Sequence, residues 1–383
     1  MLEYFPGNYP WNLALNGGMN GGGIISEIDD AVRHLIPKSK DGVAAAKEWG
    51  EAWANLARKV ETLADADLAK GHKRSASRKY KRAAAYYFVA DRNMNSHDPQ
   101  RDTVYKTGMA VFRKHVECAG EPVEFLEVPY QGKSLPAIFS PAKGVKGRAP
   151  CMIHFDGFDV NKEVIYLRGI VQELNLRGIS VLVVDHPGVG EALRLRNMPL
   201  FAEVEVPAAA SVDYLETRKD VDPKKIGIIA LSLGGYYAPR AAAFEKRLAC
   251  CVAWGAIWDY GAISEARARK IKATELSVSD WADHAMTVFG VKTVEEVLAI
   301  TSKMTLATCI DKITCPILVA HGELDRQIPL ADAQKTYDGA VNSSRRELKV
   351  FSKADGGYEH CMADNISNGI DYMADWIADV LKP

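Results

Sequence analysis

The spacing of apolar and polar residues changes once along the chain, near residue 120. Before that point apolar residues recur at intervals of three and four, as in an α-helix with one buried face. The clearest stripe consists of Trp49, Trp53, Leu56, Val60 and Leu63. Two further helices are expected over residues 75–92 and 101–118, whereas residues 1–40, with five glycines between positions 17 and 23, are expected to be irregular. The sequence therefore predicts a helical N-terminal region over residues 1–120.

After residue 121 the pattern consists of short apolar runs bounded by turn residues. The runs are VEFLEV, LPAIF, CMIHF, ISVLVV, KIGIIAL, LACCVAWG, PILVAHG and ELKVF. The first two are close enough for an antiparallel hairpin, and the others alternate with helix-length segments, which predicts a mainly parallel sheet with helices on both faces. Eight such strands fit the α/β-hydrolase fold. We expect residues 121–383 to form the catalytic domain, with a helical lid inserted at about residues 260–310.

Composition narrows the classes of function. The formal net charge is −1, so the whole molecule offers no strong field for nucleic acid or an anionic membrane. The seven cysteines lack CxxC spacing, which favours reduced thiols in a cytoplasmic protein over a disulfide framework or a metal site. No signal peptide or membrane-spanning stretch is evident. The basic run Lys70–Arg82 favours a solvated helix face over a phosphate or nucleic-acid site.

The strongest chemical signal is an apolar strand that runs into Ala-Leu-Ser-Leu-Gly and then into a helix. Ser232 is flanked two residues away on each side by Ala230 and Gly234, as the tight turn of a nucleophile elbow requires. Alanine replaces the usual first glycine and still fits sterically. We predict that Ser232 is a nucleophile, and that the amide of Leu233 is one donor of an oxyanion hole.

A serine hydroxyl needs a neighbouring base, and that base needs an orienting acid. His360 lies on the loop after the last predicted strand, which makes it the preferred base over the other histidines. Asp325 follows the penultimate strand and is the preferred acid, with Glu323 and Asp259 as alternatives. The order serine, aspartate, histidine is that of α/β-hydrolases.

The loop after CMIHF is expected to supply the second oxyanion donor. It reads Asp156-Gly-Phe-Asp159, and Phe158 is the candidate donor because Gly157 allows close approach of the backbone. Asp156 either disfavours anionic substrates or caps the turn. Further candidates for substrate contact are Asp156, Asp159, Tyr236, Trp258 and Tyr260, of which the aromatic residues fit a core role equally well.

Several motifs together resemble one group of α/β-hydrolases. They are D-G-F-D-x-x-K-E from Asp156, D-x-P-G-x-G-E from Asp185, L-S-L-G-G-Y-Y from Leu231 and R-L-A-C-C-V-A-W-G from Arg247. The group contains 2,6-dihydroxypseudooxynicotine hydrolase, the fungal heptaketide hydrolases and FrsA-like esterases. The resemblance implies a triad of Ser232, Asp325 and His360, and an active site between the hydrolase core and a helical cap. Several members of this group cleave a carbon–carbon bond beside a ketone, and others cleave esters.

The expected activity is therefore hydrolysis of a small acyl substrate through an acyl-enzyme. A carbon–carbon bond next to a ketone in an aromatic or polyketide-like compound is the leading target, and an ester or lactone is the alternative. A non-catalytic small-molecule binding protein on the same scaffold is the alternative of another class. We expect no metal and no organic cofactor, no nucleic-acid or membrane partner, and an N-terminal region able to support a homodimer.

Overall fold

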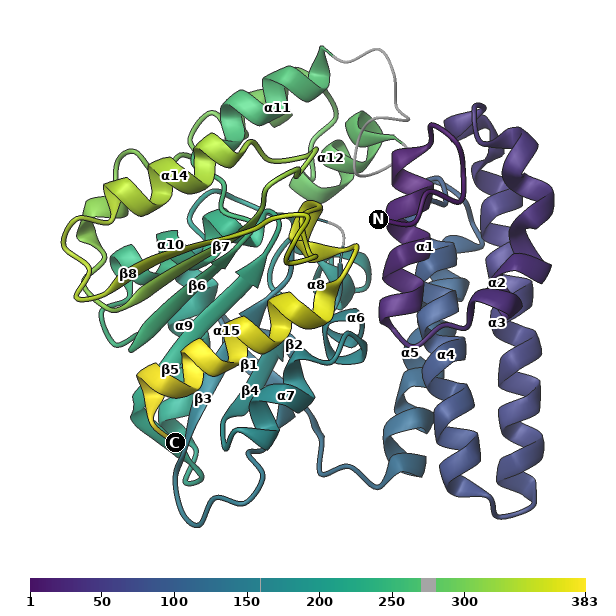
Figure 1. The fold of residues 1–383 in the computed structure, drawn as a ribbon, viewed down its shortest axis with the longest axis horizontal. Helices are drawn as coiled ribbons and strands as arrows, with labels where there is room; N and C mark the ends of the chain where they lie inside the picture. The colour runs from purple at the N-terminus through teal and green to yellow at the C-terminus, as the bar shows by residue number, and fades with distance from the viewer. Residues whose placement is uncertain (159, 270–279) are drawn as a thin grey trace. The chain divides into compact units, whose positions relative to one another are not determined.

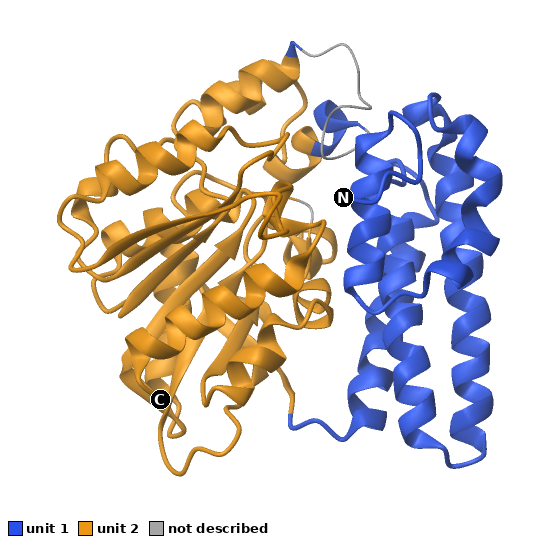
Figure 2. Ribbon diagram, in the orientation of Figure 1, with its two compact units in different colours: residues 1–122, 269–284 blue, residues 123–268, 285–383 orange. Residues whose placement is uncertain are grey.

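The chain divides into two compact units in its computed structural model, which describes residues 1–158, 160–269 and 280–383 (Figures 1 and 2). Unit 1 contains Met1–Pro122 and Arg269–His284, and unit 2 contains Val123–Ala268 and Ala285–Pro383. Asp159, a predicted substrate contact, lies outside the described residues. The predicted lid, at about residues 260–310, therefore contributes to both units, and its role over a substrate stays a prediction.

Unit 1 is helical. Its elements are α1 (Tyr9–Asn20), α2 (Ile25–Val32), the 3-10 turns η1 (Arg33–Lys38) and η2 (Gly42–Ala45), α3 (Ala46–Ala69), α4 (Lys73–Arg92) and α5 (Arg101–Ala119). The predicted stripe of α3 is buried as far as Val60, but Leu63 is 47% exposed and Ala64 is buried in its place. Trp49 lies at the centre, with its ring centroid 4.9 Å from that of Trp11 and its Nε1 donating to the Val89 carbonyl at 3.0 Å.

The expectation that residues 1–40 are irregular is wrong. Asn8 caps α1 by accepting a hydrogen bond from the Trp11 amide at 3.0 Å, a capping signal that the glycines obscured. Those glycines allow helices to pack closely rather than loosening the chain. A Cβ at Gly18 would lie 3.0 Å from Val89, and one at Gly21 would lie 3.0 Å from Ala85, both on α4.

The basic run Lys70–Arg82 mostly lies in α4. Lys79 pairs with Asp67, and Arg82 pairs with Glu27 at 3.1 Å. These acidic partners, together with the buried ring of Tyr80 on the same helix, support the interpretation of this run as a helix face within the unit's own packing.

Unit 2 is built on one eight-stranded sheet, as predicted. The strands are β1 (Glu124–Tyr130), β2 (Lys133–Ser140), β3 (Ala149–Phe155), β4 (Ser180–Val184), β5 (Val221–Leu231), β6 (Cys250–Trp254), β7 (Ile317–Gly322) and β8 (Arg346–Phe351). Their order is β1-β2-β4-β3-β5-β6-β7-β8. The β1–β2 and β2–β4 pairs are antiparallel and the others are parallel, which confirms the α/β-hydrolase fold and the hairpin at its edge.

Helices cover both faces of this sheet (Figure 1). The helices after β3 in the chain are α6 (Lys162–Leu167), α7 (Ile170–Leu176), α8 (Gly190–Arg194), α9 (Glu205–Thr217), α10 (Gly234–Phe244), α11 (Tyr260–Ala268), α12 (Trp281–Phe289, which begins in unit 1), α13 (Val294–Thr301), α14 (Leu330–Gly339) and α15 (Ile366–Leu381), with the 3-10 turns η4 (Ile310–Lys312) and η5 (His360–Met362). Figure 1 shows α15 in front of the sheet and α9 and α10 behind it. Strands β3, β6 and β7 are completely buried, as is β5 from Ile226 onward, so the carboxyl ends of the central strands hold polar side chains on a rigid base.

None of the helices in the described ranges is both long enough and apolar enough to cross a membrane.

Candidate active site

The turn between β5 and α10 has the geometry of a nucleophile elbow. Ser232 has φ of +60°, in the left-handed region that a residue with a side chain rarely adopts. Its amide donates to the Trp254 carbonyl at 2.8 Å, and its own carbonyl accepts from the Gly235 amide at 2.7 Å. A Cβ at Gly234 would lie 2.5 Å from that of Ala230, so residue 234 must be glycine while residue 230 can be alanine.

Gly235 is the tightest position of the turn. A Cβ there would lie 2.0 Å from the Gly255 carbonyl oxygen, a backbone atom on the neighbouring strand end. We expect Gly235→Ala to lower the free energy of unfolding by about 1–3 kcal/mol, because the elbow or β6 must shift. Gly144→Ala is the control, since Gly144 has φ of +75° but nothing within 4 Å, and should cost about 1–2 kcal/mol from the backbone alone.

Urea unfolding monitored by tryptophan fluorescence measures both variants. Activity separates them further, because only Gly235→Ala moves the serine. Wild-type activity in Gly235→Ala would contradict the close packing described here.

Three predicted residues form one hydrogen-bonded chain. Ser232 Oγ lies 2.9 Å from His360 Nε2, and His360 Nδ1 lies 2.8 Å from Asp325 Oδ2. The other carboxylate oxygen of Asp325 accepts from the amides of Gln327 and Ile328 at 2.7 and 3.0 Å, which fixes its orientation. This arrangement can move a proton from the serine to the histidine while the carboxylate stabilises the resulting imidazolium.

The alternative acids lie elsewhere. Asp259 forms an isolated bridge to Thr305, and its carboxylate accepts from the Ala262 amide at 3.0 Å. Glu323 is exposed.

Burial and charge shift the pKa values of His360 and Asp325 in opposite directions. Burial lowers the pKa of the His360 imidazole, but the charge and hydrogen bond of Asp325, together with the interaction with Cys361, outweigh burial and raise that pKa above its ordinary value. Burial raises the pKa of Asp325, but the charge and hydrogen bond of His360 outweigh it and lower that pKa. Asp325 is therefore an anion at neutral pH, and the imidazole holds a proton more tightly than a solvated histidine.

The residues after His360 were not anticipated from the sequence. Cys361 and Met362 have φ of +49° and +57°, a strained pair that costs of order 1–3 kcal/mol per residue. The Cys361 Sγ lies 3.6 Å from His360 Nε2 and 3.8 Å from the Trp254 carbonyl oxygen, and Trp254 Nε1 lies 2.9 Å from Met362 Sδ. The Trp254 carbonyl thus contacts both the histidine turn and the Ser232 amide.

The predicted oxyanion loop lies against the elbow. A Cβ at Gly157 would be 2.9 Å from the Leu231 carbonyl oxygen and 3.0 Å from Ser232 Cβ, so only glycine allows this approach. Phe158, the predicted donor, follows directly and is buried, as is Leu233. The two candidate donors thus adjoin residues of the elbow, Leu233 directly after Ser232 and Phe158 directly after Gly157, and the catalytic role of their amides stays a prediction.

The aromatic candidates occupy well-packed positions. Tyr236 is completely buried, and its hydroxyl donates to the Ala202 carbonyl at 3.1 Å. The Trp258 ring lies close to Gly339 on α14, where a Cβ would be 3.1 Å away. The ring of Tyr260 is 6.3 Å from that of Phe158. Tyr260 therefore lies near the predicted oxyanion loop, and substrate contact by any of the three stays a prediction.

A buried cluster of charges lies next to the same loop. Lys162 Nζ is 2.9 Å from Asp185, 3.0 Å from Glu163 and 3.0 Å from Glu191, and Asp156 is also completely buried. The sequence pointed to the Asp185–Glu191 motif only as part of the family resemblance, and its pairing with Lys162 was not predicted. The motif D-x-x-K-E, with a lysine where α6 begins, was the available signal.

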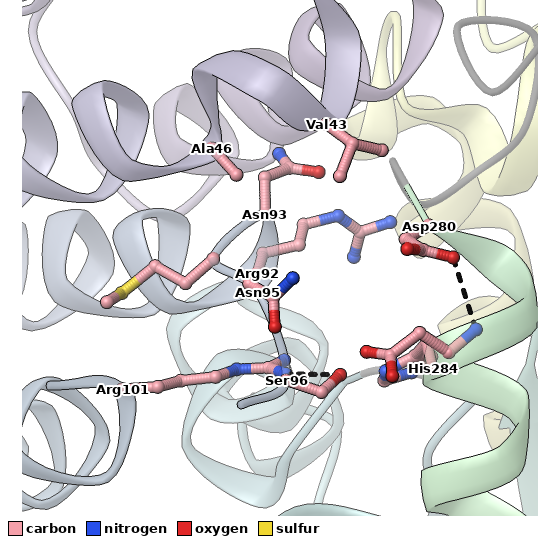
Figure 3. Close-up of a pocket in the computed structure, with 11 residues that line it drawn as sticks. Val43, Ala46, Arg92, Asn93, Asn95, Ser96, Arg101, Asp280 and His284 are labelled. Carbon is pink, nitrogen blue, oxygen red and sulfur yellow. Dashed lines mark hydrogen bonds between the residues drawn. The ribbon is translucent and has the colours of Figure 1, made fainter. Parts of the chain in front are cut away.

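Unit 1 contains a small polar pocket of its own (Figure 3). Its lining is Val43, Ala46, Arg92, Asn93, Met94, Asn95, Ser96, Arg101, Asp280, Asp283 and His284. Ser96 Oγ accepts from Arg101 at 3.0 Å, and the volume of about 20 Å³ admits roughly one water molecule. This pocket is too small to hold an acyl substrate.

No group of three or more His, Cys, Asp or Glu side chains within residues 1–158, 160–269 and 280–383 is arranged to hold a metal ion.

Comparisons with known proteins confirm the fold and the resemblance to this group of hydrolases. The profile of the prolyl oligopeptidase family matches residues 168–383. Hydrolase ORFZ of Pyricularia oryzae is 27% identical, over 90% of this chain and 88% of its own length. The 20-hydroxy-prefusarin hydrolase FUS2 of Gibberella moniliformis is 26% identical, over 81% and 82%. The 2,6-dihydropseudooxynicotine hydrolase of Paenarthrobacter nicotinovorans is 27% identical, over 87% and 84%.

Solved structures agree at the level of the fold. The crystal structure of 2,6-dihydroxy-pseudo-oxynicotine hydrolase superposes with a TM-score of 0.75 at 24% identity, over 96% of this chain and 95% of that one. Wild-type AbyA5 gives a TM-score of 0.62 at 18% identity, over 93% and 99%. Both matches extend over nearly the full length, including the helical N-terminal region.

Proposed function

Since this chain belongs to the prolyl oligopeptidase family and is a hydrolase, we propose that it cleaves its substrate through an acyl-enzyme formed on Ser232. The observation that carries the proposal is the chain of hydrogen bonds from Ser232 Oγ through His360 to Asp325, with donor–acceptor distances of 2.9 and 2.8 Å. These distances are within the reach that general-base activation of a serine requires.

In the proposed mechanism Ser232 Oγ attacks the substrate carbonyl while His360 Nε2 takes its proton. The amides of Leu233 and Phe158 bind the oxyanion of the tetrahedral intermediate. His360 then gives its proton to the leaving group, and the acyl group stays on Ser232. Water, deprotonated by His360, attacks the acyl-enzyme and releases the carboxylic acid.

We propose a substrate in which the bond cleaved is carbon–carbon, next to a ketone of an aromatic or polyketide-like compound. The leaving carbon departs with the bonding electron pair and is protonated by His360, so an electron-poor ring or a second carbonyl must stabilise that charge. Support comes from two relatives whose names give their substrates as 2,6-dihydropseudooxynicotine and 20-hydroxy-prefusarin. A carboxylester or lactone is the second candidate, because the same triad cleaves it without that requirement.

A turnover screen distinguishes these substrates. Wild type and Ser232→Ala are compared on short p-nitrophenyl esters and on an aryl β-diketone, with products identified by mass spectrometry. Diketone cleavage that is lost in the variant, with esters barely turned over, is the expected result. Fast ester turnover with an untouched diketone would replace carbon–carbon cleavage by esterase activity.

Labelling by a fluorophosphonate probe tests the alternative of a non-catalytic binding protein. An activated serine reacts with the probe, so wild type should be labelled at Ser232 and Ser232→Ala should not. An unlabelled wild type would favour the binding protein.

A further inference from the structure

Asp156 has a buried carboxyl group to which none of the described residues donates a hydrogen bond. It follows β3 directly, immediately before the loop Gly157–Phe158, and none of its surface is exposed. Within the described parts of the chain, no N–H or O–H group reaches either of its carboxyl oxygens. Burying an ionised carboxylate without a hydrogen-bond donor or a cation costs free energy. The protonation state of Asp156 therefore has to be worked out from its neighbours.

Asp185, its neighbour, has the opposite surroundings. Its Oδ1 accepts from the Lys162 amide at 2.8 Å. Its Oδ2 accepts from the Glu191 amide at 2.8 Å and from Lys162 Nζ at 2.9 Å. The turn after Asp185 is shaped around the carboxylate, because a Cβ at Gly190 would lie 2.3 Å from it. With three donors, one of them a cation, Asp185 is the ionised member of the pair.

Asp156 and Asp185 nevertheless lie next to each other, because they directly follow Phe155 and Val184, which pair at the ends of the neighbouring strands β3 and β4. Two carboxyl groups can share a hydrogen bond only when one of them carries a proton. Among the described residues, every donor that reaches the pair is directed at Asp185, so the proton belongs to Asp156.

We propose that Asp156 is a neutral carboxylic acid that donates to Asp185 and thereby positions the Gly157–Phe158 loop beside Ser232. It acts as a positioning residue, because its buried side chain is directed at Asp185 and acts on the site through the loop. The proton also removes a negative charge two residues before the Phe158 amide, where the oxyanion of the proposed mechanism would develop. This second consequence rests on the proposed function, and the protonation itself does not.

The other groups that face Asp156 agree with this assignment. Burial, followed by the charges of Asp185 and Glu163, raises the pKa of Asp156 well above its ordinary value, against the lowering effect of Lys162. His186, which contacts the Asp156 backbone, is neutral because burial lowers its pKa to about 4. Burial also raises the pKa of Tyr237, another neighbour, so that its hydroxyl adds no charge.

Asp156→Asn and Asp185→Asn form a matched pair with opposite expected results. The asparagine amide introduced by Asp156→Asn can donate to Asp185 as the acid does, so this variant should keep its turnover number within about threefold of wild type. Asp185→Asn removes the anion that holds Lys162 and the loop, and should lose about 10²-fold or more through misplacement of the site, or fail to fold. Equal damage by both substitutions, or failure of Asp156→Asn to fold, would overturn the proposal.

Two further readouts do not depend on the catalytic mechanism. The infrared band of a protonated carboxyl group should be present in wild type at neutral pH and absent in Asp156→Asn. In the unfolded chain Asp156 ionises near pH 3.9, so above that pH the folded protein holds one more proton. As the pH rises above 3.9, the folding equilibrium constant of wild type should therefore fall, relative to that of Asp156→Asn, by up to about tenfold for each pH unit. If wild type and Asp156→Asn had the same infrared spectrum in this region, and if their stabilities changed with pH in parallel, Asp156 would be ionised.

The catalytic consequence is tested separately. At alkaline pH wild type should lose turnover as Asp156 ionises, and Asp156→Asn should not. If Ser232→Ala remained active while the infrared band was present, the proposed function would fail and the protonation of Asp156 would stand.

Discussion

Ser232→Ala is expected to lower the turnover number by about 10³-fold or more, one of the two largest effects expected of a single substitution in this protein. The alanine retains the Cβ and the strained backbone of the elbow, where φ is +60°, so the fold should be unchanged. What disappears is the Oγ that lies 2.9 Å from His360 Nε2. Steady-state kinetics on the substrate selected by the turnover screen measures the loss.

Ser211→Ala provides the control for this substitution. Ser211 is completely buried in unit 2 and its hydroxyl donates to the Pro207 carbonyl at 2.8 Å, within α9. It should lose about 1 kcal/mol of stability and little activity. A Ser232→Ala variant with wild-type turnover would remove Ser232 from the mechanism and leave the hydrogen-bonded chain without a catalytic role.

The sequence was sufficient to predict the sheet and the three residues that form the hydrogen-bonded series Ser232, His360 and Asp325. Strands that are buried on both faces give continuous apolar runs, so each strand end was visible. Parallel strands bring those ends to one edge of the sheet, so Ser232, Asp325 and His360, each following a strand, were expected to meet there. The elbow could also be predicted, because only glycine fits at positions 234 and 235. A Cβ at these positions would lie 2.5 Å from the Ala230 Cβ and 2.0 Å from the Gly255 carbonyl oxygen.

The features that the sequence did not reveal depend on contacts between distant segments. The glycines near residue 20 predict an irregular segment unless α4 is known to lie against them. The strained turn at Cys361 and Met362 carries no glycine that would have marked it, and Trp254 is its tertiary partner. The protonation proposed for Asp156 depends on which donors reach Asp185, and this is set by how α6 and the β4 turn fold back on each other.

The surroundings of the nucleophile therefore combine strained backbone with close contacts. Ser232, Cys361 and Met362 all have left-handed backbones without being glycine. The Trp254 carbonyl connects them, since it lies 2.8 Å from the Ser232 amide nitrogen and 3.8 Å from Cys361 Sγ. Such conformations persist only where the surrounding packing holds them, and here that packing comes from the buried strand β6.

Asp325→Asn is expected to produce the second large effect, a loss of about 10⁴-fold in turnover. The asparagine can occupy the same space, but its amide can donate to His360 Nδ1, which would leave the proton on Nε2, where the base must accept one from Ser232. Glu323→Gln is the matched control, because Glu323 is an exposed carboxylate two residues away, and its turnover should change little. A large loss in Glu323→Gln with little effect of Asp325→Asn would exchange the roles of these two residues.

The pH profile tests the same substitution independently of the size of the loss. His360 accepts a proton only when it is neutral, so activity should rise with pH through the pKa of this residue. In wild type Asp325 raises that pKa, and the midpoint of the rise should lie above the ordinary histidine value of about 6.5. Without the Asp325 charge the largest contribution that raises the pKa of His360 is lost while burial still lowers it, so the residual activity of Asp325→Asn should rise at a lower pH than that of wild type. An unshifted midpoint would mean that the imidazolium is not stabilised by Asp325 during turnover, and that the carboxylate serves only to hold the ring.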